Sequence, residues 1–213
     1  MTRTEQPSIE ERIAACLDRR DLAQAATEAL QGYGPQIFGF LTAVLRESDA
    51  ANEAFSEFSE DLWRGIGQFR RESSFRTWAY QLAWNAARQL IRDPFHRRGR
   101  RLRTSEWSRI AEQVRSSSAA VREAAIRGRL SEMKARLDPD EQTLLILRVD
   151  RELSWKDVAA VLSEPGEPLD DAAVRKRFQR LKTKLHRMAR REGLRELLAG
   201  SVLPSRGSGT KVQ

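Results

Sequence analysis

The sequence predicts an all-α fold made of two small helical domains, joined by a flexible linker that is basic and rich in Ser. Apolar residues recur at about 3.6-residue spacing, as in amphipathic helices, and no segment alternates like a half-buried strand. This periodicity stops over a basic stretch that runs into consecutive serines, a composition typical of a tether. We therefore expect domains at residues 9–96 and 121–192, with the linker at residues 97–120.

The helices are expected in a simple order along the chain. In the first domain the periodic segments are residues 9–30, 35–46, 49–66 and 74–92. In the second domain they are residues 121–137, 139–149, 154–162 and 170–191. Residues 193–213 should form a largely disordered tail, because the end of the chain is polar and rich in Gly and Ser.

The charge of the chain favours a polyanionic partner. Its 213 residues include 38 Lys and Arg against 30 Asp and Glu, which gives a formal net charge of +8. An excess of this kind is common in proteins that bind nucleic acid. Most of the basic residues are Arg, whose planar guanidinium group can bind a phosphate through two donors at once.

Other classes of protein fit the sequence poorly. The single cysteine, Cys16, excludes an internal disulfide and a Cys-based zinc site. The two histidines, His96 and His186, have no Cys or carboxylate at metal-ligand spacing, so we expect no catalytic residues, metal, cofactor or small-molecule substrate. There is no apolar run of about 18 residues and no signal peptide, so we expect a cytoplasmic protein without membrane insertion.

The helix at residues 74–92 is the most informative element. One of its faces is an ordinary apolar stripe, whereas the opposite face carries Tyr80, Trp84 and Arg88, with Asn85 at the boundary. Unpaired bases stack on aromatic side chains and arginine binds their phosphates, so this face is suited to single-stranded nucleic acid. The alternative is that Tyr80 and Trp84 contact a neighbouring helix, which is the commoner role of such residues.

The second domain contains a predicted helix-turn-helix. Ser154 can cap the helix that begins beside it by accepting from the amide of Asp157. A turn with Pro165, Gly166 and Pro168 follows, and then a second helix with a basic, exposed first part. In a helix-turn-helix the start of the second helix contacts base edges in the major groove. The alternative is a basic, solvated surface helix.

An acidic face contrasts with this basic chain. Glu53, Glu57 and Glu60 line one side of the helix at residues 49–66, opposite its buried apolar stripe. An acidic face does not bind DNA, because both carry negative charge. It can bind a basic protein partner, or it can simply be solvated.

Together these features resemble an extracytoplasmic-function (group IV) sigma factor, one of the small promoter-specificity subunits of bacterial RNA polymerase. The resemblance covers about residues 9–191, and its most specific motif, FRRESSFRTWAYQLAWNAARQLIRD, is similar to region two of that family. The segment DAANEAFSEFSEDLWRG resembles the part of region two that binds the β′ clamp. Residues 137–162 and 172–185 resemble region four.

The resemblance implies roles for individual residues. In this family an aromatic residue and an Asn hold a base flipped out of the minus-ten element, and the matching positions are Phe69 and Asn85. The separated strand would lie along Arg76, Tyr80, Trp84 and Arg88. Region four would bind the minus-thirty-five element through Ala172, Arg175, Lys176, Gln179, Arg180 and Lys184. Glu53, Glu57 and Glu60 would bind core polymerase.

The resemblance also implies partners: core RNA polymerase, through its β′ clamp and β flap, promoter DNA, and in some members an anti-sigma factor. Two departures from the family pattern are visible. The clamp-binding helix often carries a Gln-Glu pair and a Phe, where this chain has Ser56, Glu57 and Ser59, and the turn at residues 163–168 is longer than usual. A helix-turn-helix regulator that never binds core polymerase is the alternative function.

Overall fold

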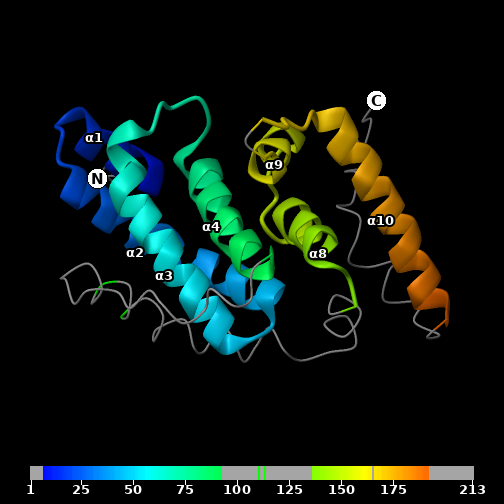
Figure 1. Ribbon diagram of the computed structural model, residues 1–213. Helices are drawn as coiled ribbons and strands as arrows, with labels where there is room; N and C mark the ends of the chain where they lie inside the picture. The colour runs from blue at the N-terminus through cyan, green and yellow to red at the C-terminus, as the bar shows by residue number, and fades with distance from the viewer. Residues whose placement is uncertain (1–6, 93–109, 111–112, 114–135, 165, 192–213) are drawn as a thin grey trace, which may run out of the picture.

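The computed structural model describes residues 7–92, 110, 113, 136–164 and 166–191. Every named secondary-structure element in these ranges is a helix, which confirms the all-α prediction (Figure 1). The elements are α1 (Ile9–Asp18), α2 (Leu22–Leu45), α3 (Ser48–Gly65), η1 (Ile66–Gln68), α4 (Phe75–Arg92), α8 (Pro139–Leu145), the π-helical turn η3 (Ile146–Asp150), α9 (Trp155–Leu162) and α10 (Asp171–Arg191). The expected linker at residues 97–120, apart from Ile110 and Gln113, lies outside the described residues. So do the tail at residues 193–213 and nearly all of the expected helix at residues 121–137.

The first helical boundary differs from the sequence prediction. We expected a break between residues 30 and 35, but Pro35 lies inside α2, and the break comes at Arg19–Asp21 instead. Arg20 has a left-handed backbone (φ 58°) that ends α1, and Asp21 caps α2 by accepting from the amide of Gln24 at 3.0 Å. Pro35 costs α2 one backbone hydrogen bond. The helix tolerates this loss because it is buried along much of its length, and this packing stabilises it.

The start of α4 is fixed by a carboxylate from α1. Glu10 accepts from the backbone amides of Phe75 (3.0 Å) and Arg76 (2.9 Å), while Ser74 accepts from the amide of Thr77 at 3.0 Å. The Tyr33 hydroxyl of α2 donates to the same carboxylate at 2.8 Å. Burial and this hydrogen bond raise the pKa of Tyr33 well above its usual range. A carboxylate at a helix N-terminus is favourable, so Glu10 holds α1, α2 and α4 in one arrangement.

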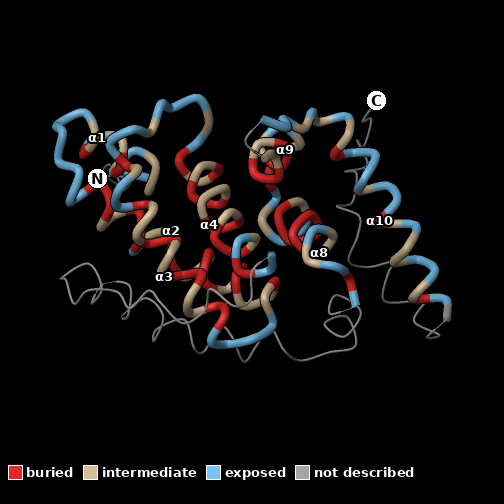
Figure 2. Tube along the Cα trace, viewed as in Figure 1, coloured by how far each residue is buried: buried red, intermediate tan, exposed pale blue. Residues whose placement is uncertain are grey.

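The described parts of the two expected domains are packed against each other. The helices α8 and α9 lie beside α2 and α4 (Figure 1), and buried residues from both halves belong to one apolar cluster. Figure 2 shows buried positions on the facing sides of α4, α8 and α9. We call this contact of α8, η3 and α9 with α2 and α4 the interdomain contact.

Polar side chains add to the interdomain contact at the end of α2. Arg46 donates to the Leu137 carbonyl at 2.5 Å and to the Gln142 side chain at 2.9 Å, and Gln142 donates to the Ala43 carbonyl at 2.5 Å. Nearer the middle of α2, Arg151 donates to the Gln36 carbonyl at 3.1 Å. These bonds and the apolar cluster fix the position of the second half on the first.

Removing the shared cap should destabilise the protein. We expect Glu10→Ala to lower the free energy of unfolding by about 1–3 kcal/mol, because two helix amides and a buried hydroxyl lose their acceptor. Tyr33→Phe should have a smaller effect, since it leaves both amides capped. Chemical denaturation of the purified variants measures this. If Glu10→Ala costs no more than Glu72→Ala, a change at an exposed carboxylate, the cap does not hold α4.

Candidate functional site

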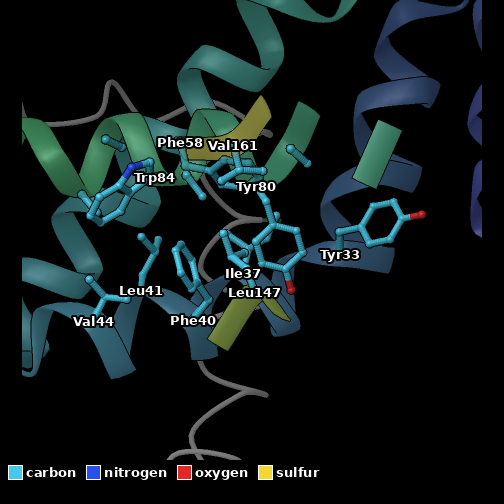
Figure 3. Close-up of a cluster of buried hydrophobic side chains, with 14 of the residues drawn as sticks. Tyr33, Ile37, Phe40, Leu41, Val44, Phe58, Tyr80, Trp84, Leu147 and Val161 are labelled. Atoms are coloured by element: carbon cyan, nitrogen blue, oxygen red, sulfur yellow. The ribbon is translucent and has the colours of Figure 1, made fainter. Parts of the chain in front are cut away.

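The aromatic residues of α4 are buried in the interdomain contact. Tyr80 is 0% exposed and Trp84 is 1% exposed. Figure 3 shows both rings in a cluster with Phe40 of α2, and with Leu147 and Val161 from the second half. The expectation that Tyr80 and Trp84 form an open surface is therefore wrong for this structure. The alternative, contact with neighbouring helices, is what the structure shows, because α9 covers this face of α4.

The ring of Tyr80 is well packed, but its hydroxyl is not paired with a polar group in the described part of the chain. Its ring lies edge-on to Phe40, with the ring centroids 5.5 Å apart, and the Arg76 guanidinium is 5.9 Å from its centroid. Its hydroxyl has no hydrogen-bond partner among the described residues, and burial raises the pKa of Tyr80. A buried hydroxyl without a partner costs about 1–3 kcal/mol, so the ring stabilises this packing while the hydroxyl opposes it.

The basic end of α4 is bound to the turn between α9 and α10. Arg88 Nη1 lies 2.8 Å and Arg92 Nη2 lies 2.6 Å from the same oxygen, Oε1 of Glu164. Arg88 also donates to Oδ1 of Asn85 at 2.8 Å. These four residues form what we call the Glu164 cluster. The hydrogen bond from Arg92, together with the charge of Arg88, holds the pKa of Glu164 below its usual range.

Phe69 lies at the other end of α4. It is half-buried, and its ring packs against those of Phe75 (5.1 Å between centroids) and Trp78 (5.2 Å). Asn85 lies seven residues beyond Trp78, on nearly the same face and roughly 10 Å further along the axis. The structure therefore places Phe69 and Asn85 along one line of the helix, separated by about two turns, and not against each other.

The residues of α10 that are expected to contact DNA are largely exposed. Val174 and Leu181 are buried against the rest of the protein, and Phe178 packs against Trp155 of α9 with 5.3 Å between centroids. Five of the six residues expected to bind the minus-thirty-five element are exposed: Ala172, Arg175, Lys176, Gln179 and Arg180. Lys184 differs, because it is half-buried and paired with Glu141 of α8. Arg175 pairs with Asp171 on its own helix at 2.5 Å.

The long turn of the helix-turn-helix is ordered by its own hydrogen bonds. Ser163 donates to the Ala159 carbonyl at 2.8 Å and accepts from the Leu169 amide at 2.9 Å. Glu164 and Glu167 exchange backbone hydrogen bonds, and Gly166 has the positive φ (83°) that a tight reversal requires. The extra length of this turn therefore forms a small hairpin that presents Glu164 to α4. The predicted cap of α9 is confirmed, because Ser154 accepts from the Asp157 amide at 3.1 Å.

The acidic residues of α3 lie where the sequence placed them. Glu53, Glu57 and Glu60 are all half-buried, on the side of α3 away from Phe55 and Phe58. Glu60 forms an ion pair with Arg64 one turn later, at 2.7 Å. The three carboxylates share one side of α3, as the prediction requires.

A cleft of about 1050 Å³ lies between α4, α8, the long turn and α10. Trp84 and Arg88 line it from α4, Asp140 and Glu141 from α8, and Arg177 and Arg180 from α10. Neither the described helices nor the described side chains supply a membrane-spanning segment or a group of three or more His, Cys, Asp or Glu suited to a metal ion.

Several residues that organise the site were missed by sequence reasoning. Glu164 and Arg92 complete the Glu164 cluster with Arg88 and Asn85, and Glu10 fixes the start of α4. Their partners are distant in sequence, so no local motif could have identified them. The only signal was the unusual length of the turn that carries Glu164.

Two comparisons with known proteins bear on the function of the chain. Residues 29–98, which include most of α2 and all of α3 and α4, match the family model described as Sigma-70 region 2. The chain is 27% identical over 143 residues to the RNA polymerase sigma-H factor of Pseudomonas aeruginosa, an alignment that covers 62% of this chain and 72% of that protein. Both similarities support a sigma factor with a role in transcription initiation.

Two substitutions separate the packing roles of the α4 aromatics. Trp84→Ala should lower the free energy of unfolding by about 3–5 kcal/mol, because it removes a large buried ring and leaves a cavity among its neighbours. Tyr80→Phe should change it by no more than about 1 kcal/mol, in either direction, because the lost hydroxyl has no partner. Denaturant titration followed by circular dichroism measures both values. A small effect of Trp84→Ala would mean that the interdomain contact is absent in solution.

Proposed function

We propose that this chain is a group IV sigma factor that binds core RNA polymerase and directs initiation at promoters through their minus-thirty-five and minus-ten elements. The observation that carries the proposal is the region two match, which falls on the helices that bear the motif from Phe69 to Arg92. The helix-turn-helix of α9 and α10 supplies the second element that such a protein needs.

Region four is proposed to bind duplex DNA through the exposed start of α10. Arg175, Lys176 and Gln179 project from the first turns, where a recognition helix contacts base edges in the major groove. Ala172 is small enough to let the helix backbone approach the bases. Arg180 is exposed one turn further on and is placed to contact phosphates, as Lys184 is once it leaves Glu141.

Region two is proposed to capture a flipped base of the non-template strand. Asn85 offers both a donor and an acceptor for the hydrogen-bonding edge of a base, and Phe69 offers an aromatic ring at the edge of the α4 surface. Arg76, Tyr80, Trp84 and Arg88 would lie along the strand. A flipped base loses a few kcal/mol of stacking, which stacking on aromatic rings and contacts with arginine offset.

Core polymerase is proposed to bind through both halves, the β′ clamp on the acidic side of α3 and the β flap on region four. An anti-sigma factor is a further proposed partner, and the cytoplasm is the proposed location. The alternative function, a helix-turn-helix regulator that does not engage polymerase, explains α9 and α10 but not the region two match.

One reconstitution distinguishes the two functions. Purified protein is added to sigma-free core polymerase with a library of promoter fragments, and the transcripts are sequenced. A sigma factor gives transcripts that start at defined promoters, whereas a regulator that does not bind core gives none.

A substitution of Asn85 tests the base pocket. Asn85→Ala should leave the melting temperature and core binding nearly unchanged, because it removes one partly exposed hydrogen bond to Arg88. Open-complex formation should fall by at least about tenfold, equivalent to 1.4 kcal/mol or more of lost base contacts, and the preference at one minus-ten position should relax. Phe69→Ala should act in the same direction. A folded Asn85→Ala protein with unchanged base preference would place the pocket elsewhere.

A charge reversal tests the acidic side of α3. Glu57→Lys should weaken binding to core polymerase at least about tenfold, because a like charge then faces a basic surface, while helicity stays native. Glu152→Lys makes the same change of charge at an exposed position outside α3 and should bind core normally. Equal affinities of the two variants would mean that Glu57 does not contact core polymerase.

A further inference from the structure

The segment that precedes the region two match contacts the loop that carries Phe69. The match begins at residue 29, so α1 and the first turns of α2 lie outside it. We propose that Asp18 of α1 is a positioning residue, which sets the base preference at the minus-ten element by holding the loop at residues 69–74 through Arg71. The inference rests on the proposed function and adds to it a specificity-determining residue outside region two.

The loop at residues 69–74 is held at both ends. At its start the ring of Phe69 packs against aromatic rings of α4, and at its end the Glu10 carboxylate of α1 caps the first amides of α4. Between these ends most of the loop is exposed, and Arg70 pairs with Glu72 at 4.0 Å, within the loop itself. The middle of the loop therefore needs a contact with another element for a fixed position.

Arg71 makes that contact. Its Nη2 atom lies 2.5 Å from Oδ1 of Asp18, and in the described part of the chain this is the ion pair that joins the loop to another helix. Arg71 also has a left-handed backbone (φ 58°), which is unfavourable for a residue with a Cβ atom and persists where its surroundings hold it. Nearby, a Cβ atom on Gly67 would lie 3.1 Å from Cδ1 of Leu22, so the start of α2 lies against the segment that leads into the loop.

The place of Asp18 in the chain is unfavourable for its own helix. Asp18 is the last residue of α1, where a carboxylate is repelled by the partial negative charge of the helix C-terminus. The last turn of α1 contains no basic residue that would offset this repulsion. The ion pair with Arg71 gives the carboxylate a favourable contact, so we assign it to the loop and not to the stability of α1.

The position of the loop matters because it lies beside the base that Phe69 is proposed to hold. A loop whose middle is free samples several positions, and a site of variable shape discriminates less well between bases. The fold itself depends little on this contact, because the Arg71 and Asp18 side chains are 50% and 64% exposed and an ion pair at such a surface contributes little to stability. Loss of Asp18 therefore separates positioning of the loop from folding.

Four promoter fragments test the proposal. They derive from one promoter found by the reconstitution above and differ only in the base at the minus-ten position with the strongest preference. Open-complex formation by core polymerase with Asp18→Ala should show a ratio between the best and the second-best base that is about two- to fivefold smaller, the range expected for an exposed ion pair. The melting temperature and core binding should not change. Glu167→Ala, which removes an exposed carboxylate from the second half, should keep the original ratio.

An exchange of the two charges shows whether Asp18 acts through Arg71. Asp18→Arg and Arg71→Asp are combined, because Asp tolerates a left-handed backbone and Arg is favourable at the end of a helix. Each single variant should have the reduced ratio, and the double variant should regain at least about half of what is lost. A double variant no better than the single ones, a folded Asp18→Ala protein with the original ratio, or an Asp18→Ala protein that does not fold would each overturn the inference.

Hydrogen exchange of the free protein separates this inference from the proposed function. The amides of residues 70–74 should exchange about two- to fivefold faster in Asp18→Ala, because the opening of the loop loses the opposition of one exposed ion pair, and the double variant should restore the original rate. Unchanged exchange would show that Asp18 does not hold the loop. If exchange rises but the unaltered protein gives no promoter-dependent transcripts, the proposed function fails and the role in base preference fails with it, while the contact of α1 with the loop stands.

Discussion

The packing of α4 between the two halves of the chain is the constraint on which the rest of the structure depends. Tyr80 and Trp84 are buried on one side by α2 and on the other by residues such as Val161 of α9. Large aromatic residues on this face of a helix are unfavourable when they are exposed to water, so a partner or another part of the chain must cover them. In this structure the second half provides that cover, so the same residues hold the two halves of the chain together.

The position of α4 is controlled at both ends by carboxylates from distant parts of the chain. Glu10 caps its first amides, and Glu164 binds the arginines of its last turns. The two contacts differ in kind. The Glu10 cap is partly buried and joined to Tyr33, whereas Glu164 is partly exposed and belongs to a surface turn. A surface ion pair is weak and sensitive to salt, so the second contact is the weaker of the two.

Much of the fold could be predicted because helix boundaries are local. The helix at residues 74–92 was predicted to within one residue, since Ser74 and the apolar stripe mark its start. The break at Arg19–Asp21 was missed, because a Pro in the sequence is a stronger local signal than a left-handed Arg. For the site, helical spacing identified the face of Tyr80 and Trp84 but not what covers it, which depends on contacts between residues far apart in the chain.

A distance measurement tests most directly whether the second half covers α4 in the free protein and leaves it when the promoter strand binds there. Spin labels at Ala23→Cys of α2 and Thr183→Cys of α10, both exposed, in a Cys16→Ala background report the separation of the two halves. The account predicts one short distance distribution for the free protein and a clearly longer one after core polymerase and promoter DNA bind. The same distribution in both states would contradict it, because the α4 surface would then stay covered while the promoter opens.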